Sequence, residues 1–86
     1  MTVVFYGKVI EYTNGETSYR PEYCPSLRSL IEKLGDCYGD SFKDFLLSSE
    51  TCIFLINGTG VLSTGGLDSP LKEGDKVEIL PFVDAG

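Results

Sequence analysis

The sequence contains no histidine and no tryptophan, and only one methionine. Histidine is the usual general base beside a nucleophile and a frequent metal ligand, so its absence removes the commonest catalytic and metal-binding arrangements. No other group of side chains pairs a nucleophile with a base. We therefore expect no catalytic residue, no metal and no cofactor.

Cysteine occurs three times, at Cys24, Cys37 and Cys52, which are thirteen and fifteen residues apart. This spacing matches neither a zinc site, nor an iron–sulfur run, nor a redox pair. The three residues are predicted to be free thiols in a reducing compartment, with Cys52 the most buried. A catalytic or persulfide-carrying thiol is disfavoured because nothing basic adjoins any of them.

Basic residues and long apolar runs are scarce as well. Seven Lys and Arg stand against thirteen Asp and Glu, and the formal charge of −6 disfavours nucleic acid and anionic membrane surfaces. No segment approaches the length of about 18 apolar residues that a membrane-spanning helix needs, and no secretory signal opens the chain. We expect a cytoplasmic, soluble protein whose charged partners are basic.

The length of 86 residues suits one small domain, and a hydrophobic content of 42% is enough to close a core. Residues 3–12 are rich in β-branched and aromatic side chains and precede Asn14-Gly15, a pair that tolerates positive φ. Residues 2–12 and 16–20 are therefore predicted to form a hairpin.

Helical periodicity follows a start signal at residues 24–26 and is expected to stop at Gly35. A second short helix is predicted from a capping box of Ser41 with Asp44. Each helix presents one apolar face, made of Leu27, Leu30, Ile31 and Leu34 in the first and of Phe42, Phe45 and Leu46 in the second.

The remaining strands are predicted at 52–56, buried on both faces and ended by a turn at Asn57-Gly58-Thr59-Gly60, at 61–63, and at 77–80. The last strand should run beside the first, with Val77 and Ile79 toward the helix and Leu80 on the opposite face. The predicted fold is α+β, a mixed sheet of about five strands with one main helix and a short second helix on it.

The chain ends on Phe82, Val83, Asp84, Ala85 and Gly86. A terminal glycine invites chemistry at its own carboxylate, and no other part of the sequence competes as a reactive site. We expect a domain at residues 1–81 and a flexible tail at 82–86.

Three segments carry a family resemblance: Phe54-Leu55-Ile56-Asn57-Gly58, the Pro-Leu-x-x-Gly-Asp-x-Val stretch of residues 70–77, and Leu80-Pro81 leading into the tail. With these segments the chain resembles, over nearly its whole length, the MoaD/ThiS family of ubiquitin-like β-grasp sulfur carriers. Its length is most similar to that of the small subunit of molybdopterin synthase. Gly74-Asp75 also has a purely structural interpretation, as a tight turn.

The resemblance implies that an adenylating enzyme of the ubiquitin-activating type uses ATP to activate Gly86, which then becomes a thiocarboxylate. That group would donate sulfur on the large subunit of a synthase, in molybdopterin biosynthesis, so the chain is a protein co-substrate and not an enzyme. Asp84 and Ala85 belong to the implied tail. The expected partner-binding residues are Tyr6, Val61, Leu62, Leu80, Pro81 and Phe82.

The chain departs from the usual family ending, Gly-Gly, because Ala85 precedes Gly86. Two alternatives therefore stay open: a β-grasp binding module that docks through Tyr6, Leu80 and Phe82, and a ubiquitin-like modifier conjugated through Gly86. Thiamine, cysteine synthesis and tRNA thiolation are other destinations for the sulfur. A ferredoxin is disfavoured because the four cysteines it needs are missing.

Overall fold

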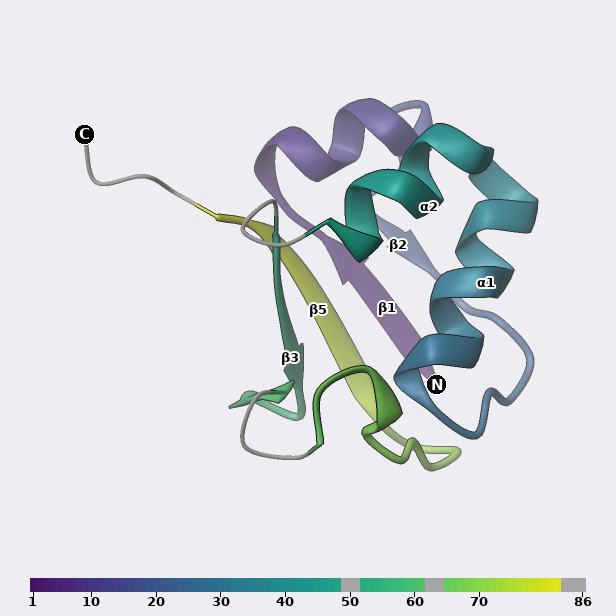
Figure 1. Cartoon of the computed structure of the whole chain (residues 1–86), viewed down its shortest axis with the longest axis vertical. Helices are drawn as coiled ribbons and strands as arrows, with labels where there is room; N and C mark the ends of the chain where they lie inside the picture. The colour runs from purple at the N-terminus through teal and green to yellow at the C-terminus, as the bar shows by residue number, and fades with distance from the viewer. Residues whose placement is uncertain (49–51, 62–64, 83–86) are drawn as a thin grey trace.

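The computed structural model describes residues 1–48, 52–61 and 65–82, and its centre is a mixed sheet with the strand order β2-β1-β5-β3-β4. The first and last strands are parallel neighbours, and the other pairings are antiparallel (Figure 1). The expected α+β architecture is confirmed. The strands are β1 (Thr2–Phe5), β2 (Ser18–Tyr19), β3 (Cys52–Ile56), β4 (Thr59–Gly60) and β5 (Lys76–Pro81).

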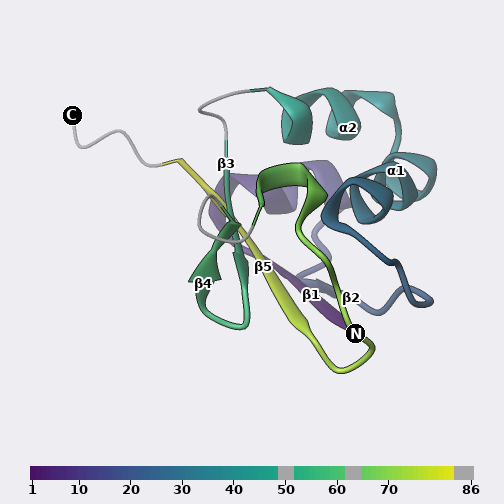
Figure 2. The same cartoon turned by 60° about the horizontal axis from the view of Figure 1, so that its bottom comes forward.

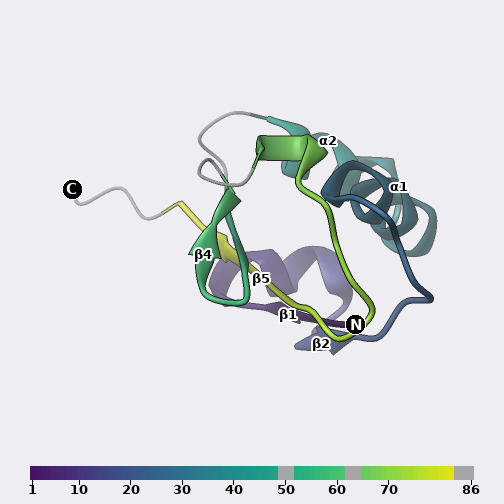
Figure 3. The ribbon, with the colours of Figure 1, turned by 90° about the horizontal axis from the view of Figure 1, so that it is seen from below.

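Helices α1 (Leu27–Tyr38) and α2 (Asp40–Leu47) lie on one side of the sheet (Figures 2 and 3). Both predicted helical faces point into the core, with Phe45 at its margin. The sheet contributes alternate residues of β1 and β5, so the expected inward side of the last strand is confirmed. The fully buried residues here are Leu27, Leu30, Ile31, Leu34, Phe42, Val3, Phe5, Val77 and Ile79.

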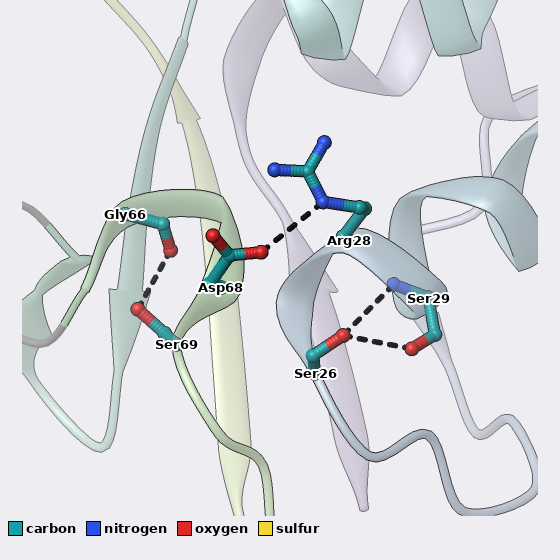
Figure 4. A network of polar contacts seen from close by, with 6 residues as sticks. All are labelled: Ser26, Arg28, Ser29, Gly66, Asp68 and Ser69. Carbon is teal, nitrogen blue, oxygen red and sulfur yellow. Dashed lines mark hydrogen bonds and ion pairs between the residues drawn. The ribbon is translucent and has the colours of Figure 1, made fainter.

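Two sets of polar contacts hold the first turn of α1 (Figure 4). Ser26 caps the helix by accepting a hydrogen bond from the Ser29 backbone N–H at 3.3 Å, as the predicted start requires. A short 3-10 helix, η3 (Gly66–Asp68), lies beside this first turn and supplies Asp68, which pairs with Arg28 at 3.2 Å. This segment therefore anchors α1 to the connection that leads into β5.

The predicted helix boundaries need correction. Gly35 does not end α1 but lies buried inside it, and the helix stops at Gly39, whose φ is 105°. The capping box is also wrong, because Ser41 lies within α2 and Gly39 precedes that helix without a side-chain cap. In the sequence Gly35 looks like a glycine that ends a helix, but its small size instead allows α1 to pack closely on Lys43 of α2.

The first predicted strand is too long, because η1 (Gly7–Thr13), a 3-10 helix, replaces its second half. Gly7 adopts φ 56°, which breaks the strand and turns Val9 into the core. The ring of Tyr12 then stacks on Phe45 of α2, with centroids 4.6 Å apart. The expected antiparallel pairing of β1 with β2 is nevertheless present.

The turn predictions hold in part. Asn14 has the positive φ that was expected, but it ends η1 instead of forming a two-residue hairpin turn. Asn57 and Gly58 also have positive φ and join β3 directly to β4. The strand that follows is therefore at Thr59–Gly60, and Val61, the first residue of the predicted strand 61–63, is not part of a strand. Residues 62 and 63 lie outside the described part of the chain.

Close packing at Gly35 makes a testable prediction. A methyl group added there would lie 2.9 Å from Cβ of Lys43, which cannot swing away as a side-chain tip can. We expect Gly35→Ala to lower the free energy of unfolding by about 1 kcal/mol, because overpacking outweighs the usual gain of alanine over glycine in a helix. Urea unfolding measures this, with Asp36→Ala on the exposed side of α1 as control. A stabilised Gly35→Ala would contradict the packing argument.

Candidate docking face and C-terminal segment

The side of the sheet opposite α1 and α2 is not covered by any described helix (Figure 3). The strand register places alternate residues of β1, β3 and β5 on this side, and Tyr6 extends the row because its N–H donates to the Ile79 carbonyl at 3.1 Å. We call this surface the outer face. It consists of Val4, Tyr6, Ile53, Leu55, Glu78 and Leu80, and the paired residues Thr2 and Lys76 continue the same side at the end of β5 farthest from the C-terminus.

Strand β5 carries the outer face directly toward the C-terminus. Leu80 is half-buried opposite Ile53, and Pro81 is half-buried opposite Cys52. Phe82 follows with 53% of its surface exposed. The predicted tail residues Asp84, Ala85 and Gly86 lie outside the described residues.

Two further predicted contact residues have different outcomes. Val61 is 9% exposed and packs in the core, so its assignment to an exposed docking surface is wrong. It lies directly after β4, where the chain turns inward instead of continuing as the predicted strand. Leu62 lies outside the described residues.

Four members of the outer face were not among the predicted contact residues: Val4, Ile53, Leu55 and Glu78. Ile53 is 41% exposed and Leu55 is half-buried, although the apolar run 52–56 had been predicted to be covered on both sides. The run itself could not reveal this, because a strand that is apolar on both faces looks alike whether the second face meets a helix or a partner protein. The structure shows that no described helix covers this side of β3 (Figure 3).

Glu78 lies at the middle of β5 on the outer face, and its side chain is only 19% exposed. The Tyr6 hydroxyl donates a hydrogen bond of 2.6 Å to Oε2 of Glu78. This bond, followed by partial burial and by the negative charge of Glu78, raises the pKa of Tyr6 above its usual value. The pair therefore places one anionic group within an otherwise largely apolar surface.

Asn57 and Asp75, which belong to the segments that carry the family resemblance, bind each other. Nδ2 of Asn57 donates to Asp75 at 2.9 Å, and Oδ1 of Asn57 accepts from the Lys76 N–H at 2.9 Å. The Lys72 N–H donates to the other oxygen of Asp75 at 2.8 Å. The two motif residues thus join the β3–β4 turn to the turn before β5, which confirms the tight-turn interpretation at Gly74-Asp75.

None of the three cysteines forms a disulfide. Cys24 is the buried one, where burial raises the pKa of its thiol, while Cys52 is half-buried, so the expectation for Cys52 is wrong. Cys37 is exposed, with Sγ 2.9 Å from the Tyr19 hydroxyl. Among the described residues, no cluster of acidic or cysteine side chains has the arrangement of a metal site, and no helix has the length and apolarity to cross a membrane.

A small mixed sheet with one face under helices and β5 leading to the C-terminus defines the ubiquitin-like β-grasp class. Solved structures with this fold include CysO of Mycobacterium tuberculosis, with a TM-score of 0.84, 25% identity and coverage of 95% of this chain and 98% of that one. Small archaeal modifier protein 1 of Methanosarcina acetivorans has a TM-score of 0.79 and 25% identity, covering 99% and 94%.

A third similar structure is a protein–protein complex of subunits 1 and 2 of molybdopterin-converting factor from Helicobacter pylori. Its TM-score is 0.67 with 25% identity, and the match covers 99% of this chain and 96% of that one. The ThiS family model matches residues 3–86. The chain therefore belongs to the ThiS family, within the MoaD/ThiS-like ubiquitin-like sulfur carriers. No functionally curated protein matches the chain in sequence.

The Asn57–Asp75 contact predicts a pH-dependent stability. Hydrogen bonds from Asn57 and then from the Lys72 backbone hold the pKa of Asp75 below its usual value of 3.8. The stabilisation is therefore fully present above pH 3.8 and is lost as the pH falls through the lower pKa of the folded state. We expect Asp75→Asn to cost about 1 kcal/mol at neutral pH, because an amide nitrogen faces a donor, and to cost progressively less in acid.

Urea unfolding between neutral and acidic pH measures this difference. Glu73→Gln is the matched control, since it removes one charge from the same turn at an exposed side chain. An equal pH dependence of the two variants would show that net charge, and not the contact with Asn57, determines the effect.

Proposed function

We propose that this chain is a sulfur carrier whose terminal Gly86 is adenylated and converted to a thiocarboxylate. The observation that supports this most is the family match, which extends through Gly86, together with β5, which leads from the outer face straight into the tail. Five residues from Phe82 onward span about 17 Å when extended, enough to enter a nucleotide site in a partner. We keep the division into a domain at 1–81 and a tail at 82–86 as part of this proposal.

The proposed chemistry uses no side chain of the carrier. A carboxylate oxygen of Gly86 attacks the α-phosphorus of ATP and expels pyrophosphate, which leaves an acyl adenylate. Hydrosulfide then attacks the carbonyl carbon and expels AMP, which leaves the thiocarboxylate and one released proton. A ubiquitin-activating-type enzyme supplies all catalytic groups, so the chain is a co-substrate and not an enzyme. Because activation consumes ATP, we place the carrier in the cytoplasm.

For the acceptor we propose the large subunit of a molybdopterin synthase. The supporting observation is the likeness to a chain in the solved complex of subunits 1 and 2 of molybdopterin-converting factor from Helicobacter pylori. A thiocarboxylated carrier should then return to the carboxylate form when it is mixed with such a large subunit and its pterin precursor. Sulfur retained under those conditions would point to another acceptor.

A modifier function is the second candidate. Its support is the similarity to small archaeal modifier protein 1, at the same 25% identity. Both functions need the same acyl adenylate at Gly86, and they differ in whether sulfide or a lysine amine attacks it. Isopeptide-linked adducts of the chain in cell extracts would favour the modifier.

Intact-mass spectrometry after incubation with ATP, sulfide and the cognate adenylating enzyme tests the proposal. We expect one oxygen replaced by sulfur in the full-length chain and no change after deletion of Gly86. Fragmentation must place the change on Gly86, because adding oxygen to Met1 or to a cysteine changes the mass almost equally. Uptake by Ala85→Gly but not by the wild type would instead favour the binding module.

The outer face should hold the adenylating enzyme while the tail enters its active site. We expect Leu80→Arg to weaken that complex by tenfold or more, since a charge would enter an apolar contact, while the free energy of unfolding changes by less than about 1 kcal/mol. Leu47→Arg, an equivalent substitution at an exposed position of α2, is the control. Normal binding of Leu80→Arg would show that the enzyme docks elsewhere.

A further inference from the structure

Glu78 is an unusual residue for the middle of an apolar surface. Its strand neighbours are Val4 on β1 and Leu55 on β3, which stand directly opposite it in the register. With 19% of the side chain exposed, most of its contact with water is already gone. An ionised carboxylate in such a position depends strongly on each remaining hydrogen-bonding partner.

Within the described residues, all of these partners contact the same oxygen of Glu78, Oε2. The Tyr6 hydroxyl donates to Oε2 at 2.6 Å, and Nζ of Lys76 lies 3.9 Å from the same atom. The side chain of Lys76 is 55% exposed, and at 3.9 Å from Oε2 its ammonium group remains hydrated. No described residue donates a hydrogen bond to Oε1, although a carboxylate oxygen can accept two. Oε1 therefore relies on water.

A protein that docks on the outer face must displace that water. Covering Tyr6, Ile53 and Leu80 removes the solvent that surrounds Glu78. A purely apolar partner would leave the charge half-paired, which is unfavourable in a desolvated interface. A cationic side chain in the partner would satisfy Oε1 and neutralise the charge.

We infer that the adenylating enzyme presents a basic side chain, arginine by preference, to Oε1 of Glu78 at the centre of an otherwise apolar contact. This inference rests on the proposed function. The enzyme is the occupant because β5 carries Glu78 and leads directly to the tail that the enzyme must receive. Arginine suits the site because its guanidinium is weakly hydrated and donates several hydrogen bonds in one plane. Glu78 thus selects between partners of similar apolar shape.

The isosteric variant Glu78→Gln tests the sign of this interaction. Its amide oxygen still accepts from Tyr6, so the apolar surface and the strand are retained. With a basic group opposite Glu78, the dissociation constant for the enzyme should rise about thirtyfold or more, as for loss of a buried charge pair. With a purely apolar partner the variant should bind as well as the wild type or better, because no charge is desolvated. Equal or tighter binding would overturn the inference.

Two matched variants separate local from general charge effects. Glu32→Gln removes the same charge from the exposed side of α1, on the helix-covered side of the sheet, and should change binding less than threefold. Lys76→Gln tests whether the carrier neutralises Glu78 by itself, and it should also bind within threefold of the wild type. A thirtyfold loss with Lys76→Gln would assign the cation to the carrier and refute the inference.

A scan of the enzyme completes the test without relying on a folded Glu78 variant. Each arginine and lysine on its carrier-binding surface is changed to glutamine, and one substitution should weaken wild-type binding about thirtyfold. Combined with Glu78→Gln, that substitution should have little further effect. If no position behaves in this way, the inference fails. If the wild type takes up sulfur at Gly86 while Glu78→Gln binds the enzyme as tightly as the wild type, the inference alone is refuted. If the wild type neither binds the enzyme nor takes up sulfur, the proposed function is refuted as well.

Discussion

The parallel pairing of β1 with β5 is the interaction on which the rest of the structure depends. It joins residues 2–5 to residues 76–79, the two ends of the chain, and backbone hydrogen bonds extend it at both limits. Closing so long a loop costs conformational entropy, which burial of Val3, Phe5, Val77 and Ile79 offsets. The pairing also places Tyr6 beside Glu78 and next to the root of the tail.

The alternation of side chains along the strands separates the buried core from the outer face, which we propose as the docking surface. Inward residues of β1 and β5 are fully buried under α1 and α2, while outward ones form the outer face. Glu78 departs from the apolar character of its neighbours Val4, Leu55 and Leu80 on this face, and a charge there adds little to folding. The proposed docking role accounts for such a local departure from the pattern.

The motif segments stabilise the fold, whereas the chemistry that we propose takes place at Gly86. Asn57 and Asp75 hold two turns together and take no part in the proposed chemistry. Gly7 allows close packing at the other end of β5, since a Cβ there would lie 3.0 Å from Cγ of Pro81. A terminal carboxylate activated by another protein needs no base or metal of its own, which agrees with a sequence that contains no histidine.

The sequence by itself determined the α+β class, both amphipathic helices and the neighbouring first and last strands, because their apolar spacing is regular and local. Its motif segments also indicated the family, and the ThiS family model matches residues 3–86. Tertiary structure decided where Gly7 ends the first strand, why Gly35 lies inside α1, and that Val61 is buried while Ile53 is exposed. These outcomes depend on which segments pack against one another across the chain, and short-range patterns carry no information about such contacts.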